Sequence, residues 1–444
     1  MPDEPKATST LDRLRRLQGL RSRRAREERE LTGLAEDALP GDPGPAGPLE
    51  QLIPGRTVEN DLGSCFLVEE RIPLETVRGV RPLGALLGRE ARGLDLPEEF
   101  DFRAAAFLDT ETTGLGNGAG VFAFMVGVGA FEEGPGGQEF VVRQFFTRHP
   151  GEEPALLHAV AELLAGRQGL VTFNGRTFDA PLLRNRYRLN RHLLPSQHEA
   201  PRLLQPAAPH LDLLPPARRL WRKRLESCAL GSLERAILDH QRREEDVPGR
   251  LIPQLYQHFL ITGQAGAMRR VFYHNREDIV SMVALAETIC RHFAAPHASA
   301  ERGEIAEAEL AGLGRLYEEQ GKLQEAERAY RRALELGREP ALLADVFFRL
   351  GRLLKRQARW QEAGEIWQRW ITTVPGPDPR PYVELAKFCE WQTGDLEQAA
   401  MWTSWALHNL QSGPSHQRSL VQLAELEHRL ARIQRKLGSQ TGPG

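Results

Sequence analysis

The sequence is poor in cysteine and contains no long hydrophobic run. Its four cysteines form no CxxC pair in 444 residues, which excludes a disulfide framework or a cysteine–zinc ribbon and fits a reducing compartment. No apolar run reaches the ~18 residues of a membrane-spanning helix. The arginine-rich N-terminus also lacks the apolar segment of a secretory signal. These absences predict a cytoplasmic protein with no membrane partner.

The chain also lacks a large net charge. Its 58 basic and 60 acidic residues leave a net charge of −2, so nucleic acid could be attracted only by local patches. Six of the 58 basic residues are lysines, and the remaining 52 are arginines. Arginine suits phosphate recognition, although a G+C-rich genome would produce the same bias.

The first hundred residues predict a tail and a small module. Residues 1–50 contain eight arginines between Arg13 and Arg29, followed by a stretch rich in proline and glycine, and they predict a disordered basic tail and linker. Residues 51–98 are turn-rich, with an apolar strand pattern after Gly63. They predict a small β-rich lead-in module.

Residues 99–295 alternate between strand and helix patterns. Apolar or alternating runs predict strands, and periodic patterns predict helices. The predicted strands are 104–108, 121–131, 139–146 and 170–173, and the predicted helices are 152–164, 178–189 and 276–293. Three strands followed by helix, strand and helix are typical of an α/β ribonuclease-H-like mixed sheet flanked by helices.

Residues 305–436 have helical patterns that repeat. Three units carry small residues at matching positions, and their central alanines, Ala326, Ala363 and Ala399, lie 37 and 36 residues apart. The pattern LG-x2-Y…A-x3-Y/F-x2-A resembles a tetratricopeptide repeat, whose period is ~34 residues. Because such helix pairs stack on their neighbours, the sequence predicts an all-α tetratricopeptide-like superhelix.

Two carboxylates follow an apolar strand pattern. Asp109 and Glu111 stand at i and i+2 in the segment FLDTETTGL, so both side chains point to the same face of a strand. Two like charges this close repel each other unless a cation neutralises them. Carboxylate oxygens are the ligands that Mg²⁺ and Mn²⁺ prefer. The pair therefore predicts a divalent-metal site.

Two further acidic positions are ambiguous when each is taken alone. Asp179 follows a strand that stops at Asn174-Gly175, and it could simply be the N-cap of the next helix. His274 and Asp278 stand four residues apart at the start of a long predicted helix, where they could form an ordinary surface pair.

The three motifs, in this order on an α/β pattern, resemble the DEDD superfamily of 3′–5′ exonucleases. The flanking sequence resembles the ribonuclease-H-like domain of the YprB-like family, over residues 50–295 of this chain. The resemblance implies hydrolysis of phosphodiester bonds in DNA or RNA with two Mg²⁺ or Mn²⁺ ions. It implies four acidic metal ligands: Asp109, Glu111, Asp179 and Asp278.

The last motif departs from both branches of that superfamily. His274-x3-Asp278 has the spacing of the tyrosine branch with a histidine in it, and Tyr273 occupies the position of the histidine-branch spacing. The i,i+4 geometry aligns His274 with Asp278, and an imidazole suits a general base at physiological pH. We therefore expect His274 to be the catalytic base, with Tyr273 as the alternative.

Candidate substrate contacts lie beside the acids and in one basic cluster. They are Thr112, Asn174, Arg218, Arg219, Trp221 and Arg222. Arginines beside an aromatic ring can hold a phosphate backbone and stack a base, although a solvated helix face with Trp221 in the core gives the same pattern.

The sequence thus predicts a metal-dependent nuclease, and more narrowly a 3′–5′ exonuclease. The repeats are predicted to dock a protein partner. One alternative is a nucleic-acid-binding protein with weak or no activity. The other is a repeat-based scaffold with an accessory nuclease fold.

Overall fold

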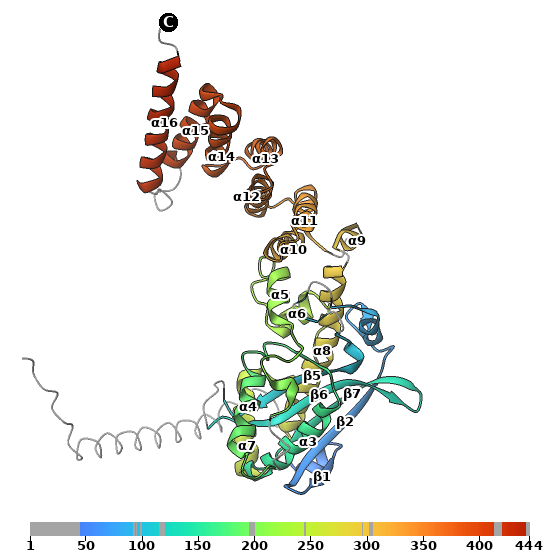
Figure 1. Cartoon of the computed structure of the whole chain (residues 1–444). Helices are drawn as coiled ribbons and strands as arrows, with labels where there is room; N and C mark the ends of the chain where they lie inside the picture. Colours follow the sequence, from blue (N-terminus) through green and yellow to red (C-terminus); the bar gives the residue numbers. More distant parts are fainter. Residues whose placement is uncertain are drawn as a thin grey trace, which may run out of the picture. The chain divides into compact units, whose positions relative to one another are not determined.

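The computed structural model describes residues 45–91, 94, 96–97, 100–114, 120–194, 200–243, 246–294, 296–301, 305–412 and 420–440. The chain divides into two compact units (Figure 1). The first takes in residues up to 89, 95–213 and 234–286, and the second takes in 90–94, 214–233 and residues from 287 onward. Positions 1–44, where the basic tail is predicted, lie outside the described residues.

The first unit is built on a seven-stranded mixed sheet with the order β1-β2-β7-β6-β5-β8-β9. The strands β1 to β7 of this sheet pair antiparallel, whereas β8 pairs parallel with β5, and β9 pairs parallel with β8. Its strands are β1 (Arg56–Asn60), β2 (Gly63–Pro73), β5 (Ala105–Thr112), β6 (Ala123–Gly134), β7 (Gly137–Phe146), β8 (Gly169–Thr172) and β9 (His210–Asp212). A separate small hairpin pairs β3 (Val77–Arg78) with β4 (Arg81–Pro82).

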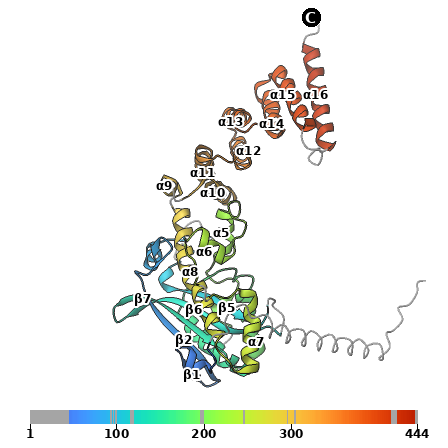
Figure 2. The same ribbon diagram turned by 180° about the vertical axis from the view of Figure 1, so that it is seen from behind.

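Helices cover both faces of this sheet (Figures 1 and 2). One core joins the strands to α3 (Glu153–Ala165) and α4 (Asp179–Asn190), and the other joins them to α7 (Ile252–Thr262) and α8 (Met268–Ala294). In β2, Cys65 and Leu67 belong to the first core and Phe66 to the second, because successive strand side chains point to opposite faces. The smaller elements are α2 (Leu49–Leu52), α6 (Leu230–Ala236) and short 3₁₀ turns at Leu83–Gly88, Phe102–Ala104, Pro150–Glu152, Arg202–Leu204 and Gly249–Leu251.

This architecture agrees with the predicted fold class and differs from the prediction in two places. The predicted lead-in segment 51–98 is not a separate module, because β2 pairs with β7 and thereby extends the main sheet. The last helix begins at Met268 instead of Arg276, since Val271 and Phe272 already pack into the core. His274 therefore lies in the second turn of α8 and does not open the helix.

The second unit is helical. Its repeats are three successive helix pairs, α10 with α11, α12 with α13, and α14 with α15, as the sequence predicts. Its helices are α5 (Leu214–Trp221), α9 (Pro296–Glu301), α10 (Glu307–Glu319), α11 (Leu323–Leu336), α12 (Pro340–Arg356), α13 (Trp360–Thr373), α14 (Arg380–Phe388) with a π-helical turn at Cys389–Thr393, α15 (Leu396–Ser412) and α16 (Leu420–Gln440). In the part of the chain that the structure describes, no helix is long and apolar enough to cross a membrane.

Glycines allow the paired helices to approach closely. A Cβ at Gly314 of α10 would lie 2.5 Å from the ring of Tyr330 in α11. At the equivalent place in the next pair, a Cβ at Gly351 of α12 would overlap the indole of Trp367 in α13. The same close contact thus recurs in two consecutive repeats, as expected for stacked units that bury their apolar faces against each other.

Candidate active site

Two of the predicted acids lie at the C-terminal end of β5. Asp109 is half-buried and Glu111 is buried. Asp109 contacts Asn275 of α8, whereas Thr110, between the two acids, contacts Asp179 of α4. This alternation places Asp109 and Glu111 on the face that α8 covers. The register between β5 and β6 shifts between Glu111 and Thr112, and such bulges are common beside active sites.

The third acid, Asp179, is the first residue of α4 and is buried. The N-cap position belongs to Phe178, so Asp179 does not have the capping role that the sequence left open. Its Oδ1 accepts a hydrogen bond of 2.5 Å from Thr110 Oγ1. This bond holds the N-terminus of α4 against β5 and brings Asp179 to the acidic pair.

The loop before Asp179 is shaped by a fourth aspartate. Asp212 of β9 accepts hydrogen bonds from the backbone N–H groups of Asn174 at 2.8 Å and Arg176 at 3.2 Å. Asn174 has a φ of 67°, a left-handed conformation that asparagine adopts more readily than most residues. The Asn-Gly signal in the sequence therefore marks a fixed turn from β8 into α4.

His274 and Asp278 lie on one face of α8, as their spacing predicts. His274 Nε2 is 3.7 Å from Asp278 Oδ2, and His274 Nδ1 is 2.8 Å from Asp246 Oδ1. Arg242 Nη1 lies 3.1 Å from the same Nδ1, but a guanidinium can only donate. The shorter contact favours an Nδ1–H group that donates to Asp246, which leaves Nε2 directed at Asp278.

A glycine in β6 allows α8 to reach Asp109. Asn275 is fully buried, and its Nδ2 donates to Asp109 Oδ2 at 2.8 Å. Its Oδ1 accepts a hydrogen bond from Gln144 Nε2 at 3.0 Å. Gly127 stands directly opposite Asp109 in the sheet, and a Cβ there would overlap Asn275 Oδ1. The absence of a side chain at position 127 thus makes room for the contact between Asn275 and Asp109.

Arg242 supplies the positive charge next to these acids. Its side chain is only 10% exposed, and it forms an ion pair with Asp278. It also donates two hydrogen bonds of 2.7 Å to Glu234, which is buried. One face of Asp278 is therefore held by Arg242 and the other lies near His274.

Burial and neighbouring charges raise the pKa values of three of the acids. Burial and the nearby charges of Asp278, Glu111 and Asp179 raise the pKa of Asp109 well above its usual range. Burial is the main cause that raises the pKa of Glu111 to about 8 and that of Asp179 to about 7. Proton binding at neutral pH therefore lowers the cost of burying these carboxylates, which lack enough positive charge nearby.

The same charges act on His274. Its burial alone would lower the pKa, but the carboxylates of Asp278, Asp246 and Glu111 outweigh burial and raise the pKa of His274 to about 9. In this arrangement His274 is protonated at neutral pH.

The four carboxylates fit divalent cations by their chemistry. Hard cations prefer carboxylate oxygens. Burial first, and neighbouring carboxylates after it, raise the pKa values of Asp109, Glu111 and Asp179, so a bound cation would favour their charged forms. Within the described residues, no three histidine, cysteine, aspartate or glutamate side chains are already gathered as a metal-binding cluster. One of the four acids, Asp278, already has a cationic partner in Arg242.

Of the predicted substrate contacts, Thr112 and Asn174 lie in the first unit near the acids. Thr112 is buried, and its Oγ1 donates to the Gly114 carbonyl at 2.7 Å. Asn174 Oδ1 accepts a hydrogen bond of 2.8 Å from Thr177 Oγ1. Both side chains thus have structural partners at the edges of the site.

The basic cluster around Trp221 belongs to the second unit. Trp221 is 1% exposed, so the prediction that it stacks a nucleobase is wrong, and the alternative of a core residue is correct. Arg218, Arg219 and Arg222 lie on the exposed face of α5. Arg219 is 3.4 Å from Glu319. This cluster therefore reads as the solvated face of a helix that packs within the repeat unit.

Tyr273, the alternative base, is directed elsewhere. Its hydroxyl oxygen accepts a hydrogen bond of 3.0 Å from the backbone N–H of Arg243, and its ring lines a cavity beside α8. Tyr273 and His274 are adjacent in α8 and so point about 100° apart around the helix, and His274 is the one that lies four residues before Asp278 on the same face.

Sequence reasoning missed Arg242, Asp246, Asn275 and Gln144. Asn275 follows His274 directly and reaches Asp109, so the HNRED motif carried a usable signal. Arg242 and Asp246 lie between α6 and α7 in a stretch without regular secondary structure, where no periodicity reveals which side chains point inward.

Comparisons with known proteins agree with this architecture. Residues 106–290 match the RNase_H superfamily, and residues 309–344 match the tetratricopeptide repeat. The chain is also similar to the crystal structure of PcrH from Pseudomonas aeruginosa, at 20% identity and a TM-score of 0.25 over 29% of this chain and 91% of that one.

One curated relative matches three quarters of the chain. The uncharacterized protein YprB of Bacillus subtilis (strain 168) is 30% identical over 339 residues, which are 75% of this chain and 75% of that protein. The first unit has the ribonuclease-H-like nuclease fold, and the second has tetratricopeptide-like repeats. The chain therefore belongs to the YprB family.

Proposed function

We propose that this protein is a metal-dependent nuclease, and more narrowly a cytoplasmic 3′–5′ exonuclease that hydrolyses the phosphodiester bonds of DNA or RNA. The observation that supports the proposal most strongly is the convergence of acids on Asp109, where burial and the charges of Asp278, Glu111 and Asp179 raise its pKa. Carboxylates from β5, α4 and α8 lie close enough to disturb one another's charge. A folded protein tolerates such repulsion at a functional site more readily than elsewhere.

The proposed metal ligands are these four acids. Two Mg²⁺ or Mn²⁺ ions held there would stabilise the attacking and leaving oxygens of an in-line displacement and lower the pKa of a bound water. Asn275 keeps the Asp109 carboxylate in a fixed orientation through its 2.8 Å hydrogen bond. Thr110 does the same for Asp179.

His274 is the proposed general base. Asp246 orients its ring through Nδ1, so Nε2 is the nitrogen that accepts the proton of the attacking water. Two of the three carboxylates that raise the pKa of His274, Asp278 and Glu111, are proposed metal ligands. Neutralisation of their charge therefore lowers the pKa of His274 toward the range in which a general base acts.

The experiment uses the full chain with 5′-end-labelled single-stranded DNA and RNA, in Mg²⁺, Mn²⁺ or EDTA. We expect a ladder of products shortened from the 3′ end, only in the presence of a divalent cation. Asp109→Asn should reduce cleavage by ~10²-fold or more, as expected when a metal ligand is lost. Asp61→Asn, which changes an exposed aspartate between β1 and β2, is the matched control.

The outcomes separate the alternatives. Wild-type protein that binds the oligonucleotides but never cleaves them would support a binding protein without activity. Cleavage by Asp109→Asn within a few-fold of wild type would refute the metal site. Internal cuts instead of a 3′ ladder would keep the nuclease and exclude the exonuclease.

For the second unit we propose docking of a protein partner, as the match to the tetratricopeptide repeat suggests. The nucleic-acid and protein partners would then use different units of one chain.

A further inference from the structure

A cavity of about 590 Å³ lies in the first unit on the side of α8 away from His274. It is lined by residues 52–54, the β2–β4 region, Gln144, three residues of the segment after α6 (His240, Gln241 and Arg243) and α8. Positions 269, 273, 276 and 280 of α8 line it, whereas His274 and Asp278 point toward the acids. The cavity is therefore separate from the candidate active site.

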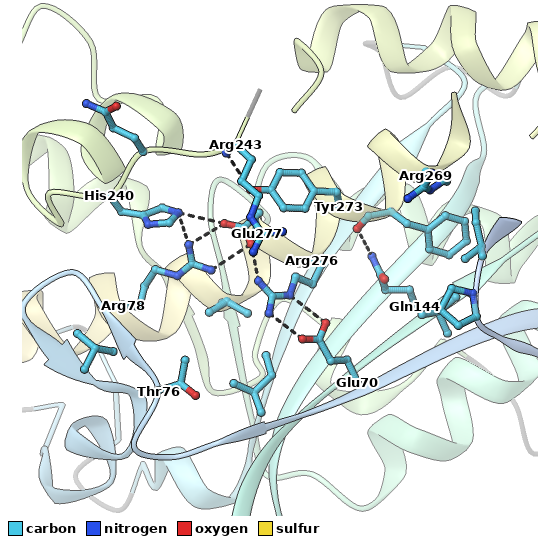
Figure 3. Close-up of a pocket in the computed structure, with 18 of the residues that line it drawn as sticks. Glu70, Thr76, Arg78, Gln144, His240, Arg243, Arg269, Tyr273, Arg276 and Glu277 are labelled. Atoms are coloured by element: carbon cyan, nitrogen blue, oxygen red, sulfur yellow. Dashed lines mark hydrogen bonds and ion pairs between the residues drawn. The ribbon is translucent and has the colours of Figure 1, made fainter. Parts of the chain in front are cut away.

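One side of the cavity is a fixed network of charges (Figure 3). Arg78, only 7% exposed, donates to Glu277 at 2.6 and 3.1 Å. Glu277 also pairs with Arg276, and Arg276 donates to Glu70 at 2.7 and 2.9 Å. His240 Nε2 lies 3.0 Å from Glu277. Because every member has a partner, this side is rigid and its charges are mutually satisfied.

Two further arginines in the lining have no such partner. Within the described residues, the guanidinium groups of Arg243 and Arg269 form no hydrogen bond or ion pair, and both side chains are exposed. Arg243 is anchored by its backbone, which donates to Tyr273 Oη. Its backbone is thus fixed beside the cavity that its side chain lines.

The charges of the lining do not balance. Its four arginines, Arg78, Arg243, Arg269 and Arg276, face two glutamates, Glu70 and Glu277, which leaves two positive charges. A phosphate monoester carries nearly two negative charges at pH 7, and the planar fork of arginine suits its oxygens. The cavity is much larger than one phosphate and also presents the Tyr273 ring, Ile72 and Val280. A ligand that fills it has an organic part beside the phosphate.

We propose that this cavity binds a nucleoside monophosphate, with the phosphate between the free guanidinium groups of Arg243 and Arg269 and the nucleoside against Tyr273 and the apolar lining. The same chemistry is present at the 5′-phosphorylated end of an oligonucleotide. The proposal does not depend on the nuclease activity, because it uses none of the four acids or His274.

Isothermal titration calorimetry of the full chain tests the proposal. EDTA is present throughout, so that no divalent cation draws phosphate to the acids. We expect adenosine 5′-monophosphate to bind and adenosine to bind at least roughly tenfold more weakly, because the charge-assisted bonds are lost. Arg243→Gln and Arg269→Gln should each weaken binding roughly tenfold. Arg56→Gln, at an exposed position of β1, is the matched control and should leave it unchanged.

Three results would overturn the proposal: no binding of the mononucleotide or of a 5′-phosphorylated oligonucleotide, equal affinity for adenosine, or unchanged affinity in both arginine variants. A 5′-phosphorylated oligonucleotide that binds through Arg243 and Arg269 when the mononucleotide does not would support the phosphate site and assign its source to a strand end. Hydrogen–deuterium exchange provides a second readout, in which ligand should protect peptides that contain residues 76–82 and 269–280.

Discussion

Replacement of Glu111 by glutamine should stabilise the metal-free protein at alkaline pH. Glu111 is 8% exposed and lies beside Asp109 at the end of β5. Burial first, and the charges of Asp278 and Asp179 after it, raise the pKa of Glu111 to about 8. Glutamine keeps the size of the side chain and removes the charge, so it removes the cost of ionising this group inside the protein.

The sign of the pH dependence follows from the direction of the pKa change. The folded-state pKa lies above the unfolded value, so the folded state binds the proton more tightly. The stabilisation is complete below the unfolded pKa of 4.5 and is lost as pH rises through about 8. Metal-free wild-type protein should therefore lose stability across this window, and Glu111→Gln should lose less.

The size of the effect has an upper limit. If Glu111 titrated alone, the difference between 4.5 and about 8 would correspond to roughly 5 kcal/mol. Asp109 and Asp179 belong to the same cluster, and protonation of one relieves the others. We therefore expect Glu111→Gln to raise the free energy of unfolding of the first unit by about 2 kcal/mol at pH 8, with little effect near about pH 5.

The assay must report on the first unit alone. All seven tryptophans, Trp221 and six from Trp360 onward, lie in the second unit, so tryptophan fluorescence does not follow the sheet. Hydrogen–deuterium exchange of peptides from β5 and β6 in EDTA, at increasing urea, measures the unfolding of the first unit directly. Tryptophan fluorescence of the same samples then serves as an internal control for the second unit.

Glu59→Gln, at an exposed position of β1, is the matched control and should change stability little at either pH. Added Mg²⁺ should stabilise wild-type protein more than Glu111→Gln, because binding to the folded state raises its stability by mass action. A Glu111→Gln protein no more stable than wild type in EDTA at pH 8, or equally stabilised at both pH values, would refute the reasoning.

Three other predictions concern the general base, Gly127 and the helical repeats. His274→Ala should lower the divalent-dependent cleavage rate by ~10²–10⁴-fold, whereas Tyr273→Phe should do much less; the reverse order in a labelled-oligonucleotide assay would reassign the base. Gly127→Ala should destabilise the first unit by about 1–3 kcal/mol and slow cleavage, because its Cβ overlaps Asn275; unchanged exchange at β6 would contradict this. Truncation after residue 295 removes α10, which packs against α5, so the emission of Trp221 should shift to the red, while a chain that keeps α10 and α11 should show no shift.

The sequence predicted the central strands because their signals are local. β6 and β7 are joined by a Gly-Pro-Gly-Gly turn and pair residue by residue from Gly134 opposite Gly137, so adjacent apolar runs and a turn are enough to place them. The pairing of β2 with β7 joins Phe66 to Phe146. No pattern within residues 51–98 indicates that β2 pairs with β7. The sequence therefore predicts a separate module at this segment.

In the candidate site, too, the sequence predicts the residues whose spacing is local and misses those that the fold brings in from elsewhere. Asp109 and Glu111 stand at a strand end, and His274 and Asp278 stand at helical spacing, so the sequence itself groups each pair. Asp246 and Arg242 reach the site from an irregular segment, and their contacts with His274 and Asp278 depend on how that segment folds back over α8. Trp221 shows the opposite error. Its arginine neighbours suggested a contact with nucleic acid, but its side chain is buried in the core.

Arg242 explains how the folded chain tolerates its acids. An isolated buried carboxylate would remain protonated, and Asp109, Glu111 and Asp179 show this tendency in their raised pKa values. Asp278 instead has a guanidinium partner, which Glu234 holds in place from its other side. A divalent cation at the proposed four-acid site would have to compete with this guanidinium for Asp278. Under that proposal, Arg242 stabilises the folded state when the acids lack another cation, and it weakens cation binding by the same interaction. Local stability and metal affinity would then be opposed at this one ion pair.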